Sequence, residues 1–227
     1  MHHSDADAVF ILGDWLELWV GDDALDDPED GAFWQDCAHT VRQAARGRPL
    51  FFIPGNRDFL IGPRFLAAAG VQALPDPTVL VWNQMRLLLS HGDAFCWDDQ
   101  AYMRFRTQVR DPEWQCHFLA RPLAERLAWA KQVRRTSEHQ KQQANAAWVD
   151  VHPAAVAQAL HQYRCIQLIH GHTHMPAVHR LVDGSTRWVL SDWDAEATPP
   201  RRSVLRWALG QAVGATYDLA SPTIKTS

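Results

Sequence analysis

Five residues of types that bind metal ions stand in short, glycine-containing loops of this sequence. They are Asp14, Asn56, His91, His172 and His174. Carboxylate, amide and imidazole ligands together suit Mn²⁺, Zn²⁺ or Fe²⁺ better than Ca²⁺ or Mg²⁺. One carboxylate can bridge two metals, and two metals about 3.5–4 Å apart can clamp phosphate oxygens during an in-line displacement. The residue types therefore predict a dinuclear metal site, bridged by Asp14, that acts on a phosphate ester.

The glycines in these loops let the backbone turn sharply beside each ligand. His172 and His174 are two residues apart, so in an extended stretch their side chains would point to one side. A single Gly-Asp or His-Gly-Asp is usually a turn. Four loops in the order Gly-Asp, Gly-Asn-Arg-Asp, His-Gly-Asp, Gly-His-Thr-His are hard to explain by structure alone. The neighbouring His170 we interpret as a packed or hydrogen-bonded residue, not a ligand.

Each loop follows a short apolar run, and such runs without polar alternation are typical of strands buried on both faces. Helical patterns separate several of these runs, which predicts a layered α/β fold. In such folds function gathers in loops at the carboxyl ends of strands. The predicted strands are 8–12, 50–53, 87–89 and 166–169, and the predicted helices are 31–46, 63–69 and 153–163.

The alternation of short apolar runs and glycine-containing loops stops after the third loop. Residues 98–148 have helical composition with breaks at Pro112 and Pro122, and we interpret them as a helical insertion over the site. Short strand signals return at 178–182, 187–190 and 203–207, which we expect to form a second sheet. The predicted organisation is a core of 1–97 and 149–207, the insertion 98–148, and a weakly structured tail 208–227.

Composition narrows the possible partners. The net charge of −4 gives no general reason to bind nucleic acid, and no apolar run approaches the roughly 18 residues of a membrane span. Residues 1–7 do not resemble a signal peptide, and four scattered cysteines are typical of a reduced, cytosolic protein. Residues 1–36 hold eleven Asp/Glu and no Lys/Arg, whereas 100–145 hold nine Lys/Arg against four Asp/Glu. Two solvated faces, or an acidic metal site with a basic segment for an anionic substrate, both fit this distribution.

Three longer segments carry a resemblance to a known family. They are GDWLELWVGDD at 13–23, GNRDFL at 55–60 and HGDAFCWDD at 91–99. They resemble the calcineurin-like metallophosphoesterase superfamily and, within it, the UDP-2,3-diacylglucosamine hydrolases of lipid A biosynthesis, from about residue 7 to 196. Arg57 stands where most of the superfamily has His, and Tyr102 also matches these hydrolases.

The resemblance implies an αββα sandwich that cleaves the pyrophosphate of UDP-2,3-diacylglucosamine to UMP and 2,3-diacylglucosamine 1-phosphate (lipid X). It implies two Mn²⁺, one held by Asn56, His91 and His172, the other by His174, with Asp14 as the bridge. The planar guanidinium of Arg57 would act catalytically on developing phosphate charge. The positions that would contact the substrate are Asn56, Arg57, Asp99, Ser137, Lys141 and His172.

The resemblance also implies a place in the cell. The insertion would hold the acyl chains, with its basic side chains near anionic lipid headgroups. The protein would be a peripheral membrane protein on the cytoplasmic face of the bacterial inner membrane. Ala144 departs from the family, where a lysine is expected. Oligomeric state is not implied.

The family opens with a strand that carries Asp-x-His, and no such pair precedes Asp14. We therefore expect the first strand to be missing, one metal site to lack two ligands, and activity to depend on adding an Asp-x-His segment. Two alternatives stay open: a metallophosphoesterase that acts on other nucleotides, and an inactive, truncated form. The Arg57 variant and the helical insertion favour the lipid A hydrolase.

Overall fold

The computed structural model describes residues 6–143, 150–208, 215–218 and 221–225. The chain divides into two compact units. Unit 1 comprises Met1–Pro75 and Asp98–Val149, and unit 2 comprises Asp76–Trp97 and Asp150–Ser227. Each unit is described by itself.

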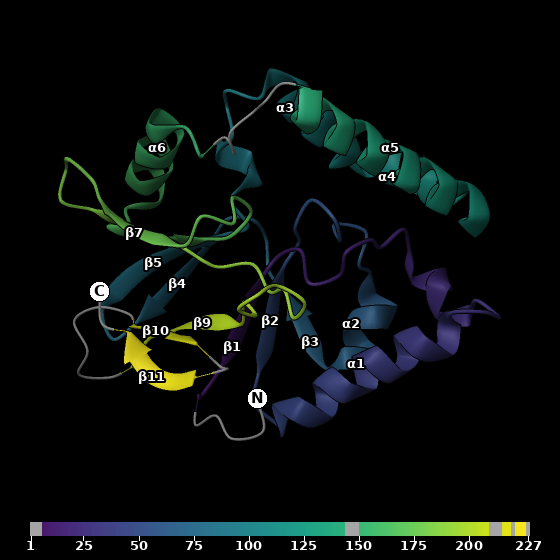
Figure 1. The fold of residues 1–227 in the computed structure, drawn as a ribbon, viewed down its shortest axis with the longest axis horizontal. Helices are drawn as coiled ribbons and strands as arrows, with labels where there is room; N and C mark the ends of the chain where they lie inside the picture. The colour runs from purple at the N-terminus through teal and green to yellow at the C-terminus, as the bar shows by residue number, and fades with distance from the viewer. Residues whose placement is uncertain (1–5, 144–149, 209–214, 219–220, 226–227) are drawn as a thin grey trace. The chain divides into compact units, whose positions relative to one another are not determined.

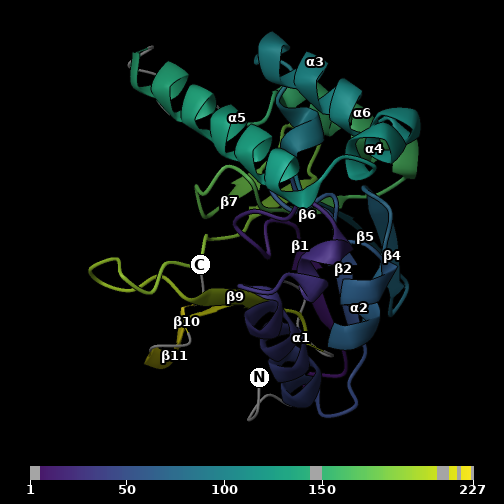
Figure 2. The same ribbon diagram turned by 90° about the vertical axis from the view of Figure 1, so that its right-hand side faces the viewer.

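Unit 1 contains a parallel sheet in the order β1-β2-β3. The helix α1 connects the first two strands and α2 the next two, and both helices lie beside this sheet (Figures 1 and 2). Phe52 and Phe65 are among the side chains buried between helices and sheet. The bounds are β1 Val9–Leu12, α1 Gly31–Ala45, β2 Leu50–Ile53, α2 Pro63–Ala69 and β3 Val71–Ala73, with a short 3-10 helix at Asp22–Asp26.

The helix α2 has its ends fixed by sequence. Pro63 occupies its first turn, where a missing N–H costs nothing, and Gly70 ends it with a left-handed backbone. The carboxylate of Asp22 accepts hydrogen bonds from the backbone of Gly62, Arg64 and Phe65 at 2.8–3.1 Å. A distant acidic residue therefore satisfies N–H groups that a helix start leaves without partners.

Three further helices of unit 1 lie in the predicted helical segment: α3 Gln100–Val109, α4 Pro112–Leu119 and α5 Leu123–Gln143. The predicted breaks are confirmed, since α4 begins at Pro112 and α5 begins just after Pro122. Arg126 of α5 is fully buried and donates to the Val20 carbonyl and to the Asp23 carboxylate. This arginine anchors α5 to the acidic part of unit 1.

Unit 2 contains a five-stranded mixed sheet in the order β4-β5-β6-β8-β7. Its central strands β5, β6 and β8 are parallel to one another, and α6 packs on it through Val156 and Leu160. The strands β9, β10 and β11 form a separate antiparallel sheet. The bounds are β4 Thr78–Trp82, β5 Met85–Ser90, α6 Pro153–Tyr163, β6 Gln167–His170, β7 Ala177–Arg180, β8 Thr186–Val189, β9 Ser203–Arg206, β10 Ala215–Asp218 and β11 Ser221–Lys225, with a 3-10 helix at Asp93–Phe95.

The α/β class is confirmed, with two corrections. The strands β7 and β8 do not belong to a second sheet, because β8 pairs with β6 and β7 pairs with β8, in the sheet that carries two of the predicted ligand loops. Two strands form within 208–227, where only weak structure was predicted: β10 pairs with β9, and β11 pairs with β10. Strand pairing is non-local, so a short run does not reveal its partner. No described helix is long and apolar enough to cross a membrane.

Candidate metal centre

The parallel pair β1 and β2 brings two of the predicted loops to one edge of the unit 1 sheet. Leu12 pairs with Ile53, so Asp14 and Asn56 both follow the carboxyl ends of adjacent strands. The backbone N–H of Arg57 donates to the Asp14 carboxylate at 3.0 Å. A Cβ on Gly55 would lie closer than 3.0 Å to the backbone nitrogen and a carboxylate oxygen of Asp14. Only glycine allows the two loops to approach this closely.

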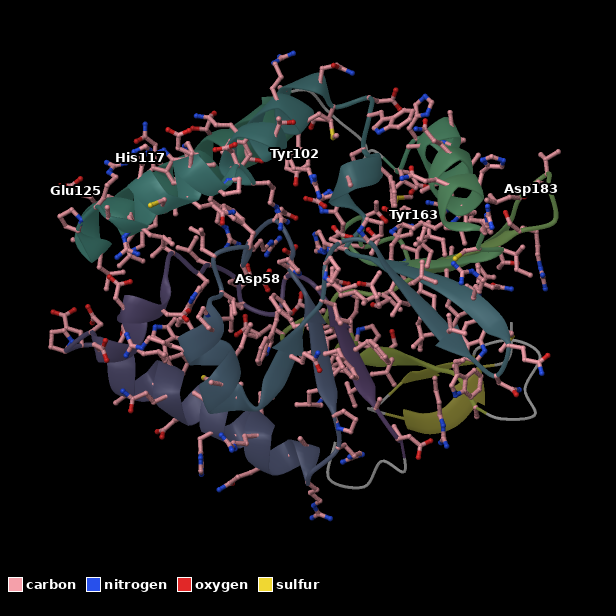
Figure 3. All side chains as sticks on the ribbon, turned by 180° about the vertical axis from the view of Figure 1, so that it is seen from behind. Asp58, Tyr102, His117, Glu125, Tyr163 and Asp183 are labelled. Atoms are coloured by element: carbon pink, nitrogen blue, oxygen red, sulfur yellow. The ribbon has the colours of Figure 1, made fainter. Side chains whose placement is uncertain are left out.

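Asp58, labelled in Figure 3, ties these two loops together from inside the protein. Its side chain is fully buried. One carboxylate oxygen accepts from the backbone of Trp15 at 2.6 Å and Leu16 at 3.3 Å, and the other accepts from Gly55 at 2.8 Å. A buried carboxylate needs such donors. Asp58 therefore fixes Asp14 relative to Asn56, a role that its place in the loop motif did not predict.

The guanidinium of Arg57 lies beside the predicted bridging ligand. Its Nε is 3.5 Å from the Asp14 carboxylate, and its Nη1 donates to Glu17. Arg134 of α5 also reaches Glu17, with nitrogen and oxygen 2.8 Å apart. The Arg57 side chain remains 28% exposed, so a substrate can reach it. The structure thus places Arg57 next to Asp14, and its catalytic role stays a prediction.

The parallel pair β5 and β6 brings the histidine loops to one edge of the unit 2 sheet. Ser90 pairs with His170, so His91 and His172 both follow strand ends. The two rings are T-shaped with centroids 5.0 Å apart, and each offers a nitrogen within 4.8 Å of the other's. The N–H of Gly171 donates to the His91 carbonyl at 2.9 Å. One strand edge therefore presents two imidazoles at a distance that a single metal ion could span.

The extended conformation considered for His172 and His174 is wrong. Both have a left-handed backbone, with φ of 66° and 53°. Thr173 between them is buried, and its N–H donates to the Gly171 carbonyl at 2.8 Å, which closes a tight turn. Among the described residues its hydroxyl has no hydrogen-bond partner. Buried orphan groups are rare in proteins and mark places that an ion or water completes.

Left-handed backbone occurs at three of the five predicted ligands. The described non-glycine residues with positive φ fall into two groups. Four have local structural causes: Arg46 and Arg164 end helices, and Asn83 and Gln84 form the β4–β5 hairpin turn. The other three are Asp14, His172 and His174. Such conformations cost about 1–3 kcal/mol each and persist at functional sites.

His174 has an acidic neighbour of its own. Its Nδ1 lies 3.9 Å from the carboxylate of Asp192. Arg201 binds that carboxylate through two nitrogens at 2.8 and 2.7 Å, which lowers the pKa of Asp192. Asp192 is therefore an acidic neighbour of His174, at a separation longer than a hydrogen bond.

His170 is packed and hydrogen-bonded, as the sequence indicated. It is fully buried, and its Nδ1 lies 2.9 Å from the Gly171 carbonyl. Burial lowers the pKa of His170 to about 4, so the ring is neutral at pH 7. Arg187 lies 3.5 Å from its other nitrogen and binds Asp150 at 2.6 and 2.7 Å. His170 therefore belongs to the support of the histidine loop.

Three of the predicted substrate residues lie outside the ligand loops. The Asp99 carboxylate caps α3, since it accepts from the backbone of Tyr102 at 2.9 Å. Ser137 is exposed on α5. The side chain of Lys141 and all of Ala144 lie outside the described residues. Substrate contact by Asp99, Ser137 and Lys141 stays a prediction, as does the incomplete second metal site.

The residues present fit a divalent metal. Unit 1 offers the carboxylate of Asp14 and the amide of Asn56, beside Gly55, where a larger residue would collide with Asp14. Unit 2 offers imidazoles with strained backbone around a buried, unpartnered hydroxyl. Oxygen and imidazole donors of this kind suit Mn²⁺, Fe²⁺ or Zn²⁺.

No family model matches this chain. Among solved structures, Vps29 from Cryptosporidium parvum is 15% identical, with a TM-score of 0.44 over 96% of this chain and 93% of that one. The UDP-2,3-diacylglucosamine hydrolase of Chromobacterium violaceum is 46% identical over 187 residues, 82% of this chain and 76% of its own.

A second relative matches over a longer stretch. The UDP-2,3-diacylglucosamine hydrolase of Bordetella pertussis is 45% identical over 202 residues. The match covers 87% of this chain and 77% of that protein. Identity at this level over most of both chains establishes descent from a common ancestor. The chain belongs to the UDP-2,3-diacylglucosamine hydrolase family.

Proposed function

We propose that this chain hydrolyses the pyrophosphate bond of UDP-2,3-diacylglucosamine to UMP and 2,3-diacylglucosamine 1-phosphate, a step of lipid A biosynthesis. Family membership supports the reaction, and one structural observation supports the site. That observation is the left-handed backbone at Asp14, His172 and His174, which no helix end or hairpin accounts for. The three residues came from sequence motifs alone, so the agreement between motif and backbone strain is independent support.

The five predicted ligand residues would hold two Mn²⁺, in the arrangement that the family resemblance implies. Asn56, His91 and His172 would bind one ion, His174 the other, and Asp14 would bridge them. When bound, two divalent ions supply positive charge at the phosphoryl group and a nucleophile at neutral pH.

Arg57 would stabilise the negative charge that develops on the phosphoryl oxygens. Its guanidinium is held by carboxylates on two sides, Asp14 and Glu17. A preorganised cation costs no reorganisation at the moment of reaction, which is what transition-state stabilisation requires. Asn56 and His172 would contact the substrate phosphates as well as the metal. Asp99, Ser137 and Lys141 would contact the remainder of the substrate.

We further propose peripheral binding to the cytoplasmic face of the inner membrane through the helical segment 98–148. A diacylated substrate resides in a membrane, and this segment combines an excess of Arg/Lys with Leu, Trp and Phe. Sedimentation with anionic vesicles should fall as salt rises, because screening weakens attraction between surface charges. Vesicle binding that does not change with salt concentration, or absence of binding to anionic vesicles, would contradict this proposal.

The reaction is tested by UMP release from UDP-2,3-diacylglucosamine in detergent with added Mn²⁺. Both the chain and a form preceded by an Asp-x-His segment are assayed, because the sequence predicts that activity depends on that pair. The proposal expects Mn²⁺-dependent UMP release by at least one form. A dinucleotide or nucleoside diphosphate hydrolysed faster than the acylated substrate would favour the nucleotide alternative. Inactivity of both forms would contradict the proposal.

A further inference from the structure

Arg110 connects the helical segment of unit 1 to the loop that carries Asn56 and Arg57. It caps the carboxyl end of α3, and its backbone N–H bonds to the Arg106 carbonyl at 3.0 Å. Its side chain leaves the helix and donates from one guanidinium nitrogen to the carbonyls of Pro54 at 3.1 Å and Gly55 at 2.9 Å. These are the two peptide groups immediately before Asn56.

The same side chain is fixed by a second contact. The guanidinium carbon lies 5.2 Å from the centroid of the Phe59 ring, within the range of a cation–π interaction. Phe59 belongs to the same stretch as Pro54 and Gly55. Arg110 therefore holds the Gly-Asn-Arg-Asp loop at both its beginning and its end.

Gly55 lies between two opposite charges. Its N–H donates to the buried carboxylate of Asp58, and its carbonyl accepts from the guanidinium of Arg110. Hydrogen bonds to ionised groups are shorter and stronger than neutral ones. Because the carbonyl of Gly55 and the N–H of Asn56 share one planar peptide, fixing that carbonyl fixes the direction in which the chain enters Asn56.

We propose that Arg110 is a positioning residue for hydrolysis, which sets the orientation of Asn56 and Arg57 from the end of α3. This inference rests on the proposed function, because Asn56 and Arg57 are its metal ligand and catalytic cation. The contacts that carry this proposal run from Arg110 to the loop backbone at Pro54 and Gly55. It makes the geometry of the loop depend on the placement of α3, a helix of the segment proposed to hold the acyl chains.

The kinetic test compares Arg110→Ala, Arg110→Lys and the control Arg42→Ala. Arg42 lies outside segment 98–148 and the ligand loops, and like Arg110 it donates to a backbone carbonyl, that of Ala67 at 3.1 Å. UMP release is measured at saturating Mn²⁺ in the form that is active. Arg110→Ala should lower kcat about tenfold with little change in KM, because a misplaced loop loses transition-state contacts. Arg110→Lys should have a kcat between those of the parent and Arg110→Ala, since an ammonium lacks the planar fork. Arg42→Ala should match the parent.

Two further readouts separate positioning from general destabilisation. Free guanidinium, below denaturing concentrations, should restore part of the activity of Arg110→Ala and none of the activity lost in Arg57→Ala. Amide hydrogen exchange of the metal-free chain should accelerate at residues 55–57 in Arg110→Ala, and not in Arg42→Ala. The exchange measurement needs no activity, so it decides about Arg110 even where the hydrolysis proposal fails.

The inference is overturned if exchange at 55–57 and kcat are both unchanged in Arg110→Ala. It is also overturned if exchange accelerates equally throughout unit 1 in both Arg110 variants, because that describes a residue that only stabilises the fold. A chain that releases no UMP in either form, yet shows faster exchange confined to 55–57, would contradict the function and keep Arg110 as the residue that positions the loop.

Discussion

Among the proposed site residues, Arg57 has the most specific proposed role, which is to stabilise developing phosphate charge. It reaches two carboxylates, Asp14 and Glu17, and is partly exposed. A cation held this way has little freedom left to lose when it meets a phosphate. It is therefore suited to stabilise a transition state more than to capture a substrate from solution.

Replacing Arg57 with Ala should lower kcat by roughly 10²–10³ and leave KM nearly unchanged, by analogy with the loss of an oxyanion donor. Arg64→Ala is the matched control, because that arginine is also paired with a carboxylate, Asp26, yet stands outside the ligand loops. Steady-state kinetics on both variants decide the matter. A change confined to KM would make Arg57 a ground-state clamp on the substrate.

The sequence predicted the candidate ligand residues but not the residues that hold their loops in place through hydrogen bonds. Asp14 and the histidines were found because their motifs follow strands. Asp58, Glu17 and Arg110 were missed because their partners are fixed only by the fold: Arg110 is 55 and 56 positions from the carbonyls it binds. The left-handed backbone of the histidines was also missed, since a polar loop does not specify its φ angles.

The proposed site depends on loops at the carboxyl ends of parallel strands. In unit 1 the β1 and β2 loops approach so closely that a Cβ on Gly55 has no room beside Asp14. The obstructing atoms include backbone, which cannot swing away as a long side chain can. The strands were predictable from their apolar runs, and so were α2 and α6, because a proline in the first turn marks the start of each.

Gly55→Ala should push the two loops apart, at a cost of about 1–3 kcal/mol in the free energy of unfolding. It should also weaken Mn²⁺ binding, because Asp14 and Asn56 move relative to each other. Gly47→Ala is the control: its positive φ costs stability, but its Cβ meets nothing within 4 Å. Denaturant unfolding and Mn²⁺ titration of both variants test this. Equal metal affinity in both would contradict the account.

The pair of Asp150 and Arg187 joins the segment before α6 to β8. Arg187 is buried and binds Asp150 through two nitrogens, which lowers the pKa of that carboxyl below its usual 3.8. With a folded-state pKa below the unfolded value, the stabilisation is fully present above about pH 4. It is lost as the pH falls through the folded-state value.

Asp150→Asn should therefore cost stability at pH 7, by about 1–3 kcal/mol for a broken charged hydrogen bond. The difference between parent and variant should stay constant from pH 7 to about pH 5 and shrink as the pH falls below about 4. Urea unfolding of both proteins across this range measures it. A difference that grows on acidification would contradict the lowered pKa.

The chain divides into two compact units. Each unit is continuous in space but discontinuous in sequence, since 98–149 belongs with 1–75. The motifs predicted which residues bind metal without predicting this division, because a chain's return to an earlier unit leaves no local pattern. The sequence also assigned the 98–148 segment as helical, and α3, α4 and α5 lie there.

We propose that Asn56 and His91 bind one and the same metal ion. Asn56→Ala removes a proposed ligand from unit 1, His91→Ala removes one from unit 2, and the double variant removes both. Mn²⁺ bound per chain, measured by elemental analysis after equilibrium dialysis, should fall in each single variant. The double variant should lose no more than either single one, because all three lose the same ion. A double variant that loses the sum of the two single losses, or a parent chain that binds no Mn²⁺, would contradict the account.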